Sequence, residues 1–380
     1  MIYLDNAATS FPKPAECLRA ALERFLQLGA SPGRGGYDLA VEAEAAVSAV
    51  RRKVGRFFGA DESWRVCFTS NATDALNTLI QGLLRPGDHV VSSRLEHNSV
   101  LRPLHHLRDS RGVRFELVPF NAEGFIEPEV VARAVTPATR LVILTHASNV
   151  LGTVQPVAEI AALCRTRGVP LVLDASQSAG VIPLRVRDWG AAAVAFTGHK
   201  SLLGPTGIGG LLLGPDLDPE PTRFGGTGVD SRSLHHTPTY PHRLEAGTLN
   251  LLGVLGLEAG LDHVERTQAA SYAREMELLK TLRDGLSRLP RLRIYCAARL
   301  ENHLPLLTCT VEGRASEDVG AILDGDYGIA VRAGLHCAPL VHRDLGTSEK
   351  GAVRFSLGPF TTEADIGRAL DAMAAIARRA

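Results

Sequence analysis

The sequence has no surplus of charge of either sign and no long hydrophobic run. Its 41 basic and 41 acidic residues give a formal net charge of zero, so nucleic acid is not an expected partner. The apolar run Gly207–Leu213 is too short to cross a bilayer, and the N-terminus Met1–Asn6 lacks the basic start and apolar stretch of a secretion signal. We therefore expect a cytoplasmic protein with a small-molecule substrate and no membrane association.

Cysteine is also scarce, and no C-x-x-C pair occurs. The six cysteines are scattered along the chain, at Cys17, Cys67, Cys164, Cys296, Cys309 and Cys337. This spacing argues against a zinc site and against a secreted disulfide framework, so no metal is expected. Reduced thiols are expected instead, and one of them can be reactive.

The middle of the 380-residue chain alternates apolar β-rich runs with helical patterns. The predicted strands are Arg65–Thr69, His89–Ser93, Arg114–Pro119, Arg140–Thr145, Val169–Asp174, Ala192–Thr197 and Gly209–Leu213. The predicted helices between them are Ala72–Leu84, Ser99–Ser110, Pro128–Ala134 and Val157–Arg167. This alternation predicts an α/β domain with a seven-stranded, mostly parallel sheet and helices on both faces.

From about residue 265 the pattern changes to that of a smaller α+β domain. Its expected elements are the helices Thr267–Ser287, Glu317–Leu323 and Thr362–Arg378 and the strands Leu292–Cys296 and Leu306–Val311. The last helix begins with Thr362 and Asp365, a typical helix start. We expect a large domain of residues 15–264 and a small domain of residues 1–14 and 265–380.

Polar residues follow two of the buried strands, at the sheet edge where α/β proteins bind ligands. Asp174 ends one strand, and Lys200 follows another with Thr197 and His199 beside it. Alone, an aspartate here is usually a helix cap and a lysine is usually solvated, by about nine to one. Their joint occurrence, 26 positions apart, favours a cofactor site.

These groups meet the requirements of pyridoxal phosphate (PLP), which needs an amine, an acid, an anion site and a wall for its ring. Lys200 can supply the amine for a Schiff base, and its pKa can fall when it is desolvated near other cations. Asp174 can keep the pyridine nitrogen protonated. The sequence therefore predicts PLP as the cofactor.

The PLP phosphate is expected at a helix N-terminus, where backbone N–H groups and the helix dipole favour an anion. Ala72 and Thr73 begin a predicted helix and offer N–H groups and a hydroxyl. Thr197 and His199 are expected to complete this phosphate site.

Three further side chains follow strands and are expected at the same crevice. His97 can stack on the cofactor ring, and Asn149 and Gln177 can hydrogen-bond its phenolic oxygen. Taken alone, His97 is better explained as a surface histidine beside a turn, and Asn149 as an ordinary turn asparagine.

Motifs along the whole chain resemble those of the cysteine desulfurases, in the class V branch of the fold type I PLP-dependent transferases. They are Tyr3–Thr9, Glu96-His97-Asn98, Ser148–Thr153, Asp174–Gln177, Thr197–Lys200, Gly204–Gly209 and Glu245–Thr248. The resemblance implies the roles given above for Lys200, Asp174, His97, Asn149, Gln177, Thr73, Thr197 and His199. It further implies a homodimer in which Thr248 reaches the phosphate of the partner's cofactor.

Cys337 is the candidate for a reactive thiol. A free cysteine is more often an inert core residue, and Cys17, Cys164 and Cys309 are interpreted in that way. Cys337 differs because Arg332 and His336 can lower its pKa and because its loop, rich in glycine and proline, indicates exposure. The loop resembles the R-x-G-x-H-C-A segment of the SufS-type (group II) desulfurases.

Two positions depart from the family pattern. Leu335 stands where many relatives have histidine, which leaves thiolate activation to His336 and Arg332. Ala72 stands where a threonine often supplies a phosphate hydroxyl. By contrast, Arg354 matches the arginine that binds the substrate carboxylate, with Asn149 and Arg332 as further substrate-binding residues; the alternative for Arg354 is a surface ion pair.

The resemblance implies conversion of L-cysteine to L-alanine, in sulfur metabolism such as iron–sulfur cluster assembly. Lys200 removes the Cα proton, and Cys337 takes the substrate sulfur as a persulfide, from which a sulfur-acceptor protein can receive it. One alternative is another class V enzyme, a selenocysteine lyase, an aminotransferase or an epimerase, in which Cys337 is dispensable. Another is a PLP-carrying scaffold with cofactor absorbance and no turnover.

Overall fold

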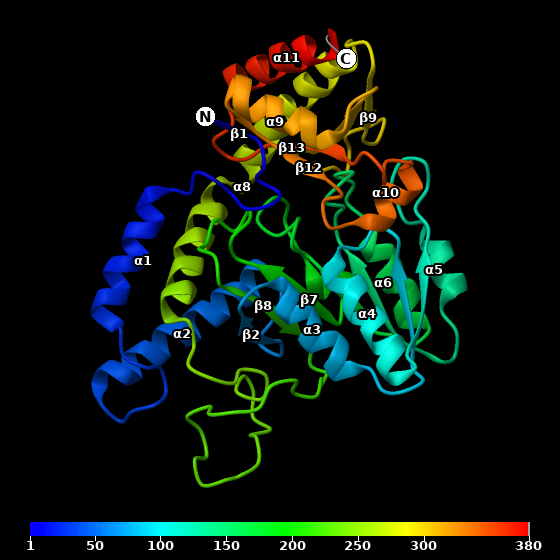
Figure 1. The fold of residues 1–380 in the computed structure, drawn as a ribbon. Coiled ribbons are helices and arrows are strands. Elements are labelled where there is room, and N and C mark those ends of the chain that lie inside the picture. The colour runs from blue at the N-terminus through cyan, green and yellow to red at the C-terminus, as the bar shows by residue number, and fades with distance from the viewer. Residues whose placement is uncertain (379–380) are drawn as a thin grey trace.

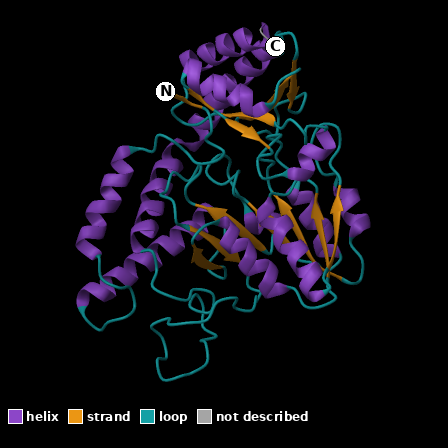
Figure 2. Ribbon diagram, viewed as in Figure 1, coloured by secondary structure: helices purple, strands orange, loops and turns teal. Residues whose placement is uncertain are grey.

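A seven-stranded sheet forms the centre of the larger part of the molecule (Figures 1 and 2). The computed structural model describes residues 1–378. In sheet order the strands are β2 (Arg65–Thr69), β8 (Gly209–Leu213), β7 (Ala193–Thr197), β6 (Leu171–Asp174), β5 (Thr139–Thr145), β3 (His89–Ser93) and β4 (Arg114–Val118). Strand β8 pairs antiparallel with β2 and β7, and the other pairs are parallel. The predicted sheet is confirmed.

Helices cover both faces of this sheet because successive strand residues are buried on opposite sides. In β7, Ala193 and Ala195 belong to one apolar cluster, whereas Val194 and Phe196 belong to the other. Helices α3 (Ala72–Leu83) and α4 (Asn98–Arg111) pack on the first side. The second side is covered by α2 (Asp38–Phe57), α5 (Pro128–Ala134), α6 (Val157–Thr166) and the short α7 (Val186–Trp189). Burial on both faces explains why the strands read as nearly continuous apolar runs.

The smaller part contains a four-stranded antiparallel sheet and a two-stranded parallel one. The first is formed by β12 (Arg332–Gly334), β13 (Ala352–Ser356), β10 (Leu306–Val311) and β9 (Leu292–Tyr295), and the second by β1 (Ile2–Tyr3) and β11 (Ile329–Ala330). Helices α9 (Ser316–Tyr327) and α11 (Glu363–Arg378) complete it, whereas α10 (Pro339–Leu345) packs its Val341 in the apolar cluster of the large sheet. Neither α1 (Ala15–Leu28) nor α2 is predicted from the sequence, and the same holds for the short helices α7 and α10 and for the strands β1, β11, β12 and β13.

Helix α8 (Leu251–Leu286) joins the two parts, and its predicted start at Thr267 is wrong. The helix begins earlier because Val254 and Leu261 of its first half pack in the core of the large sheet. Leu279 and others of its second half pack in the core of the small sheet. The change to a polar pattern near Thr267 therefore does not mark the start of a new helix. It marks the part of α8 that lies between the core of the large sheet and the core of the small sheet. We propose that the domain boundary expected after residue 264 lies inside this helix.

The parallel strands point toward the smaller part, as their arrowheads show in Figure 2. Residues at their carboxyl ends therefore face the junction between the two parts, where ligands of open α/β sheets bind. Within residues 1–378, no helix is both long and apolar enough to cross a membrane.

The long loop between β8 and α8, residues 214–250, projects from the body of the molecule in Figure 1. A buried ion pair fixes its end: Arg51 Nη1 lies 2.5 Å from Glu245 Oε1, with the two side chains only 13% and 3% exposed. The Arg51 guanidinium also lies over the Phe68 ring, 4.7 Å from its centroid. Glu245 thereby fixes the segment that continues to Thr248.

Removing one partner of a buried ion pair costs about 3–5 kcal/mol, because the other charge stays buried and unpaired. We expect Glu245→Ala to lower the free energy of unfolding by about that amount in a urea titration. Arg187→Ala, which breaks an exposed pair with Asp61, should change it by less than about 1 kcal/mol. Equal losses in the two variants would contradict this structural role of Glu245.

Candidate active site

A cavity of about 310 Å³ lies at the carboxyl ends of the parallel strands. The predicted site residues that line it are Ala72, Thr73, His97, Asn149, Asp174, Gln177, Thr197, His199, Lys200, Arg332, Cys337 and Arg354. Thr248 does not line it and is exposed on the projecting loop. The fold therefore brings together residues from both ends and the middle of the chain.

Asp174 and Lys200 follow neighbouring strands of the sheet. The Asp174 carboxylate is held in place because its Oδ1 accepts hydrogen bonds from the Ser176 backbone N–H at 2.9 Å and from the Ser176 hydroxyl. Burial lowers the pKa of Lys200 to about 8, although the nearby Asp174 carboxylate acts in the opposite direction. A lysine with this pKa has a usable fraction of neutral, nucleophilic amine near neutral pH.

His97 is the N-cap of α4, which fixes its ring at the cavity wall. Its Nδ1 accepts the Ser99 backbone N–H at 3.0 Å and lies 2.6 Å from the Ser99 hydroxyl. Burial and the Lys200 charge lower the pKa of His97 to about 4, so the ring is neutral at physiological pH. Ser99 also contacts the Thr73 hydroxyl at 2.9 Å. Sequence reasoning missed Ser99, whose only signal is its place two residues after the capping histidine.

Besides Arg354 Nε, two buried polar atoms of cavity-lining residues have no hydrogen-bond partner among residues 1–378. They are Thr197 Oγ1 and His199 Nδ1, and both residues line the cavity near the N-terminus of α3. An unmade hydrogen bond at a buried group costs about 1–3 kcal/mol. This arrangement fits a ligand that brings its own polar oxygens, such as a phosphate group at the positive end of the helix.

Asn149 and Gln177 each use part of their amide group within the protein. Asn149 Nδ2 donates to the His336 carbonyl at 2.7 Å, and Gln177 Nε2 donates to the Ala7 carbonyl at 3.1 Å. An amide nitrogen carries two hydrogens. One donor on each side chain thus remains for a ligand oxygen.

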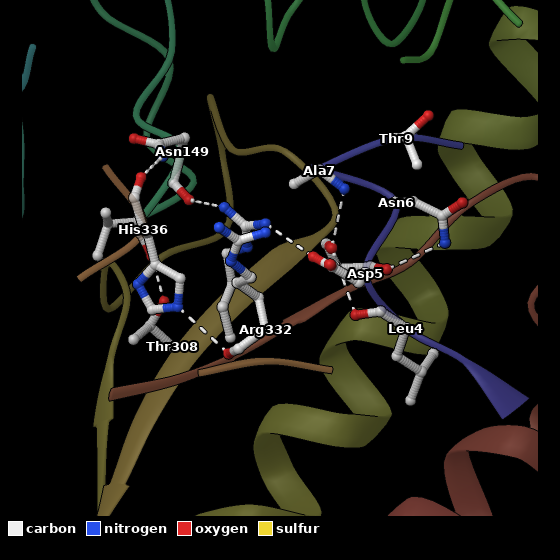
Figure 3. A network of polar contacts seen from close by, with 12 residues as sticks. Leu4, Asp5, Asn6, Ala7, Thr9, Asn149, Thr308, Arg332 and His336 are labelled. Atoms are coloured by element: carbon white, nitrogen blue, oxygen red, sulfur yellow. Dashed lines mark hydrogen bonds and ion pairs between the residues drawn. The ribbon is translucent and has the colours of Figure 1, made fainter. Parts of the chain in front are cut away.

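Arg354, on β13, connects three distant segments of the chain. Its Nη2 lies 2.9 Å from Asp5 Oδ1, and its Nη1 donates to the Asn149 carbonyl at 2.9 Å. Figure 3 shows Asp5 and Asn149 on opposite sides of this network. The ion pair is buried, with Arg354 only 3% exposed. Arg354 Nε has no partner among the described residues, which leaves a donor for an anionic ligand group.

Asp5 is a second residue that sequence reasoning did not assign to the site. It lies in the Tyr3–Thr9 motif, and its acidic side chain is the one available signal. Its partner, Arg354, is 349 positions away, so only the tertiary structure shows the pair.

Cys337 is exposed in the short loop between β12 and α10, whereas its neighbour His336 is buried. Burial and the nearby arginines lower the pKa of His336 to about 2. The His336 ring is therefore neutral and supplies no positive charge to the loop. Of the two residues proposed to activate the thiol, only Arg332 carries a permanent charge.

The chain is similar to cysteine desulfurases in sequence and in fold. Residues 2–369 match the family described as aminotransferase class-V. A probable cysteine desulfurase of Methanothermobacter thermautotrophicus is 36% identical over 372 residues, or 96% of this chain and 92% of that protein. A solved apo cysteine desulfurase of Thermococcus onnurineus has a TM-score of 0.91 at 32% identity, covering 100% of this chain and 95% of that one. The Escherichia coli cysteine desulfurase CsdA, in an S-sulfonic acid form, has a TM-score of 0.85 at 28% identity, covering 99% and 94%.

The electrostatic link between Lys200 and Asp174 can be tested by titration. In protein freed of small molecules and labelled by ¹³C reductive methylation, the Lys200 signal should titrate near pH 8. Asp174→Asn should lower this midpoint, because the carboxylate stabilises the ammonium form. Lys13, whose pKa burial alone lowers to about 8, serves as the internal control and should not shift. An unchanged Lys200 midpoint would show that the two groups do not interact.

Proposed function

The chain belongs to the aminotransferase class-V family, among its cysteine desulfurases, and from this premise we propose how its residues perform the reaction. L-cysteine is converted to L-alanine, and its sulfur is transferred to Cys337 as a persulfide. The observation that carries this proposal is the shared cavity, which is lined at once by Lys200, Arg354 and the exposed thiol of Cys337.

Enzymes of this family use PLP, and the cavity fits it. The unpartnered Thr197 Oγ1 and His199 Nδ1, with the start of α3 at Ala72 and Thr73, would hold the phosphate. Burial lowers the pKa of His199 to about 4, so His199 would act as a neutral hydrogen-bonding group there. Ala72 contributes only its backbone, so the hydroxyls come from Thr73 and Thr197.

The remaining cavity groups would hold the ring of the cofactor. Lys200 would carry it covalently, Asp174 would face the pyridine nitrogen, and the neutral His97 would lie against the ring face. Asn149 and Gln177 each keep one N–H for the phenolic oxygen. When bound, PLP supplies the electron sink that makes the substrate Cα proton acidic.

Arginine and asparagine side chains would bind the substrate, and Lys200 would act on it. Arg354 Nε would orient its carboxylate, with Asn149 and Arg332 as further substrate-binding residues of the same cavity. The amine of Lys200 would take the Cα proton, which its pKa of about 8 permits near neutral pH.

Cys337 would perform the sulfur transfer. A bond forms between its Sγ and the substrate sulfur as the Cβ–S bond of the substrate breaks. The electron pair of that bond stays with the carbon fragment, which takes up a proton and leaves as alanine. Cys337 keeps one extra sulfur, and its exposed position would let a sulfur-acceptor protein collect it. The short loop between Gly334 and Pro339 supports placement among the SufS-type (group II) enzymes.

A homodimer is the proposed working form. Large apolar side chains are exposed along α1, α2 and the projecting loop, at Leu18, Leu22, Leu26, Leu39, Val41, Phe224 and Leu234. Several large exposed apolar side chains on α1 and on the neighbouring α2 support a protein contact at this surface. In the dimer, Thr248 would reach the cofactor phosphate of the other subunit. The cytoplasm is the proposed compartment, since all six cysteines are free thiols.

Cys337→Ala distinguishes this function from the other class V reactions, in which the thiol is dispensable. The variant should still bind L-cysteine, because binding depends on Lys200 and Arg354, but should release sulfur at less than about a hundredth of the wild-type rate. Cys296→Ala, a partly exposed cysteine outside the cavity, is the matched control and should keep full activity. Mass spectrometry without reductant should find one extra sulfur on the wild-type Cys337 peptide. Alanine production by Cys337→Ala at the wild-type rate would refute the proposal.

The dimer can be tested by charging its proposed contact. Light scattering should give a dimer for the wild-type protein, and the double variant Leu22→Glu/Leu26→Glu should dissociate and lose activity, because Thr248 no longer reaches the second site. Phe360→Glu, at an exposed apolar residue near α11, should leave the dimer intact. A monomer with full activity would contradict the shared site.

A further inference from the structure

The loop that carries Cys337 has an unusual backbone. His336 and Cys337 have φ values of 50° and 55°, so two successive residues with side chains adopt the left-handed conformation. Each such residue costs about 1–2 kcal/mol. The conformation persists only where surrounding contacts hold it in place.

Two hydrogen bonds from the large domain hold the backbone of this loop. The Asn98 N–H donates to the Cys337 carbonyl at 2.8 Å, and Asn149 Nδ2 donates to the His336 carbonyl at 2.7 Å. Both donors lie beside the cavity, at the start of α4 and in the loop after β5. These bonds fix the two carbonyl groups, but they do not hold the His336 ring.

The His336 ring lies at one end of a buried chain of hydrogen bonds. Its Nδ1 is 3.0 Å from His342 Nε2, and His342 Nδ1 is 2.8 Å from the Thr347 hydroxyl. At the other side of the ring, His336 Nε2 is 3.3 Å from the Arg332 carbonyl. His336, His342 and Thr347 are 5%, 0% and 6% exposed.

The direction of each bond in this chain follows from its acceptor end and from the neutral state of both rings. Burial lowers the pKa of His336 to about 2 and of His342 to about 4, so each ring carries one hydrogen. A carbonyl can only accept, so His336 Nε2 donates to Arg332, and His336 Nδ1 accepts from His342 Nε2–H. His342 Nδ1 then accepts from the Thr347 hydroxyl, which also lies 3.4 Å from the His342 carbonyl.

The charged groups around the pair favour the same state. Arg354 and Arg332 both lower the pKa of His336, and no carboxylate opposes them among the groups that act on it. For His342, burial alone lowers the pKa. Both rings thus stay neutral throughout the physiological pH range.

The chain of bonds spans the two ends of α10. His336 precedes this helix, His342 lies within it, and Thr347 follows its left-handed C-cap Gly346. The Thr347 backbone N–H also donates to the His342 carbonyl at 2.8 Å. The helix and the cysteine loop are therefore fastened to each other as one unit.

Cys337 borders two spaces, the cavity with Lys200 and an outer hollow lined by Arg102 and His106 of α4. A thiol that takes sulfur on one side and passes it on at the other needs a fixed backbone, with only its side chain turning.

From these contacts we propose that His342 and Thr347 are positioning residues for Cys337. Through the His336 ring they hold the loop in the left-handed conformation that aims the thiol into the cavity. The effect on sulfur transfer rests on the proposed function, whereas the effect on the loop does not.

The test uses the holoenzyme and two variants of one position. Thr347→Val removes the hydroxyl at nearly constant volume, and Thr347→Ser keeps it. We expect Thr347→Val to lower kcat for sulfur release by about ten- to a hundredfold at an unchanged KM, because small displacements of a reacting group have effects of this size. Thr347→Ser should stay within about twofold of the wild-type protein. His342→Leu should resemble Thr347→Val, and His342→Gln, which restores a donor to His336, should recover part of the rate.

A second readout separates positioning from general damage. Exchange of the alanine α-proton depends on Lys200 and not on the thiol, so it should be unchanged in Thr347→Val. An equal loss in this exchange, an equal loss in Thr347→Ser, or wild-type sulfur transfer in Thr347→Val would each overturn the proposal.

The rate of Cys337 alkylation by iodoacetamide tests the loop independently of turnover. It should differ about fivefold or more between Thr347→Val and the wild-type protein and should be restored in Thr347→Ser. If the wild-type protein released no sulfur from L-cysteine, the proposed function would fail, and this alkylation rate would still decide the positioning role. Equal alkylation rates in all three proteins would refute it.

Discussion

The buried ion pair between Arg354 and Asp5 is the contact on which the cavity depends. It joins β13, the N-terminal segment and, through the Asn149 carbonyl, the loop after β5. Burying two charges is costly unless each is paired and hydrogen-bonded, so the three segments are held at fixed positions relative to one another. The network in Figure 3 therefore holds Asn149 and Arg354, two residues that line the cavity, against the N-terminal segment. The same guanidinium keeps one free donor, Arg354 Nε, for the carboxylate of the substrate. Arg354 would therefore both hold the three segments together and bind the substrate.

Burial has a common effect on the basic groups of the site. It lowers the pKa of Lys200 to about 8, and the pKa values of His97 and His199 to about 4. The imidazoles are consequently neutral, and Lys200 exchanges between ammonium and neutral amine near neutral pH. This division suits the proposed reaction, because a neutral amine can take a proton and a neutral ring can lie against a cofactor without repelling Lys200.

The cysteine loop combines exposure of its thiol with burial of the two histidines that support it. Cys337 is open to solvent, whereas His336 and His342 are enclosed and joined by hydrogen bonds. A strained backbone at a functional residue is stable only where the surroundings determine it fully. The loop thus obtains its conformation from α10 and from the large domain, and its sequence alone does not favour that conformation.

The sequence by itself determined the parallel sheet, the helices between its strands from α3 to α6 and the cavity residues that follow strand ends, because these depend on short-range periodicity and on the common edge of parallel strands. It also indicated Cys337, by its loop composition. Only the tertiary structure decided the pairing of Arg354 with Asp5, the contact of His336 with His342 and the full length of α8. Each of these depends on which residues the folded chain buries together, and short-range sequence patterns do not show this. His336 shows the reason most clearly: its place beside Cys337 suggested a charge, and desolvation removed it.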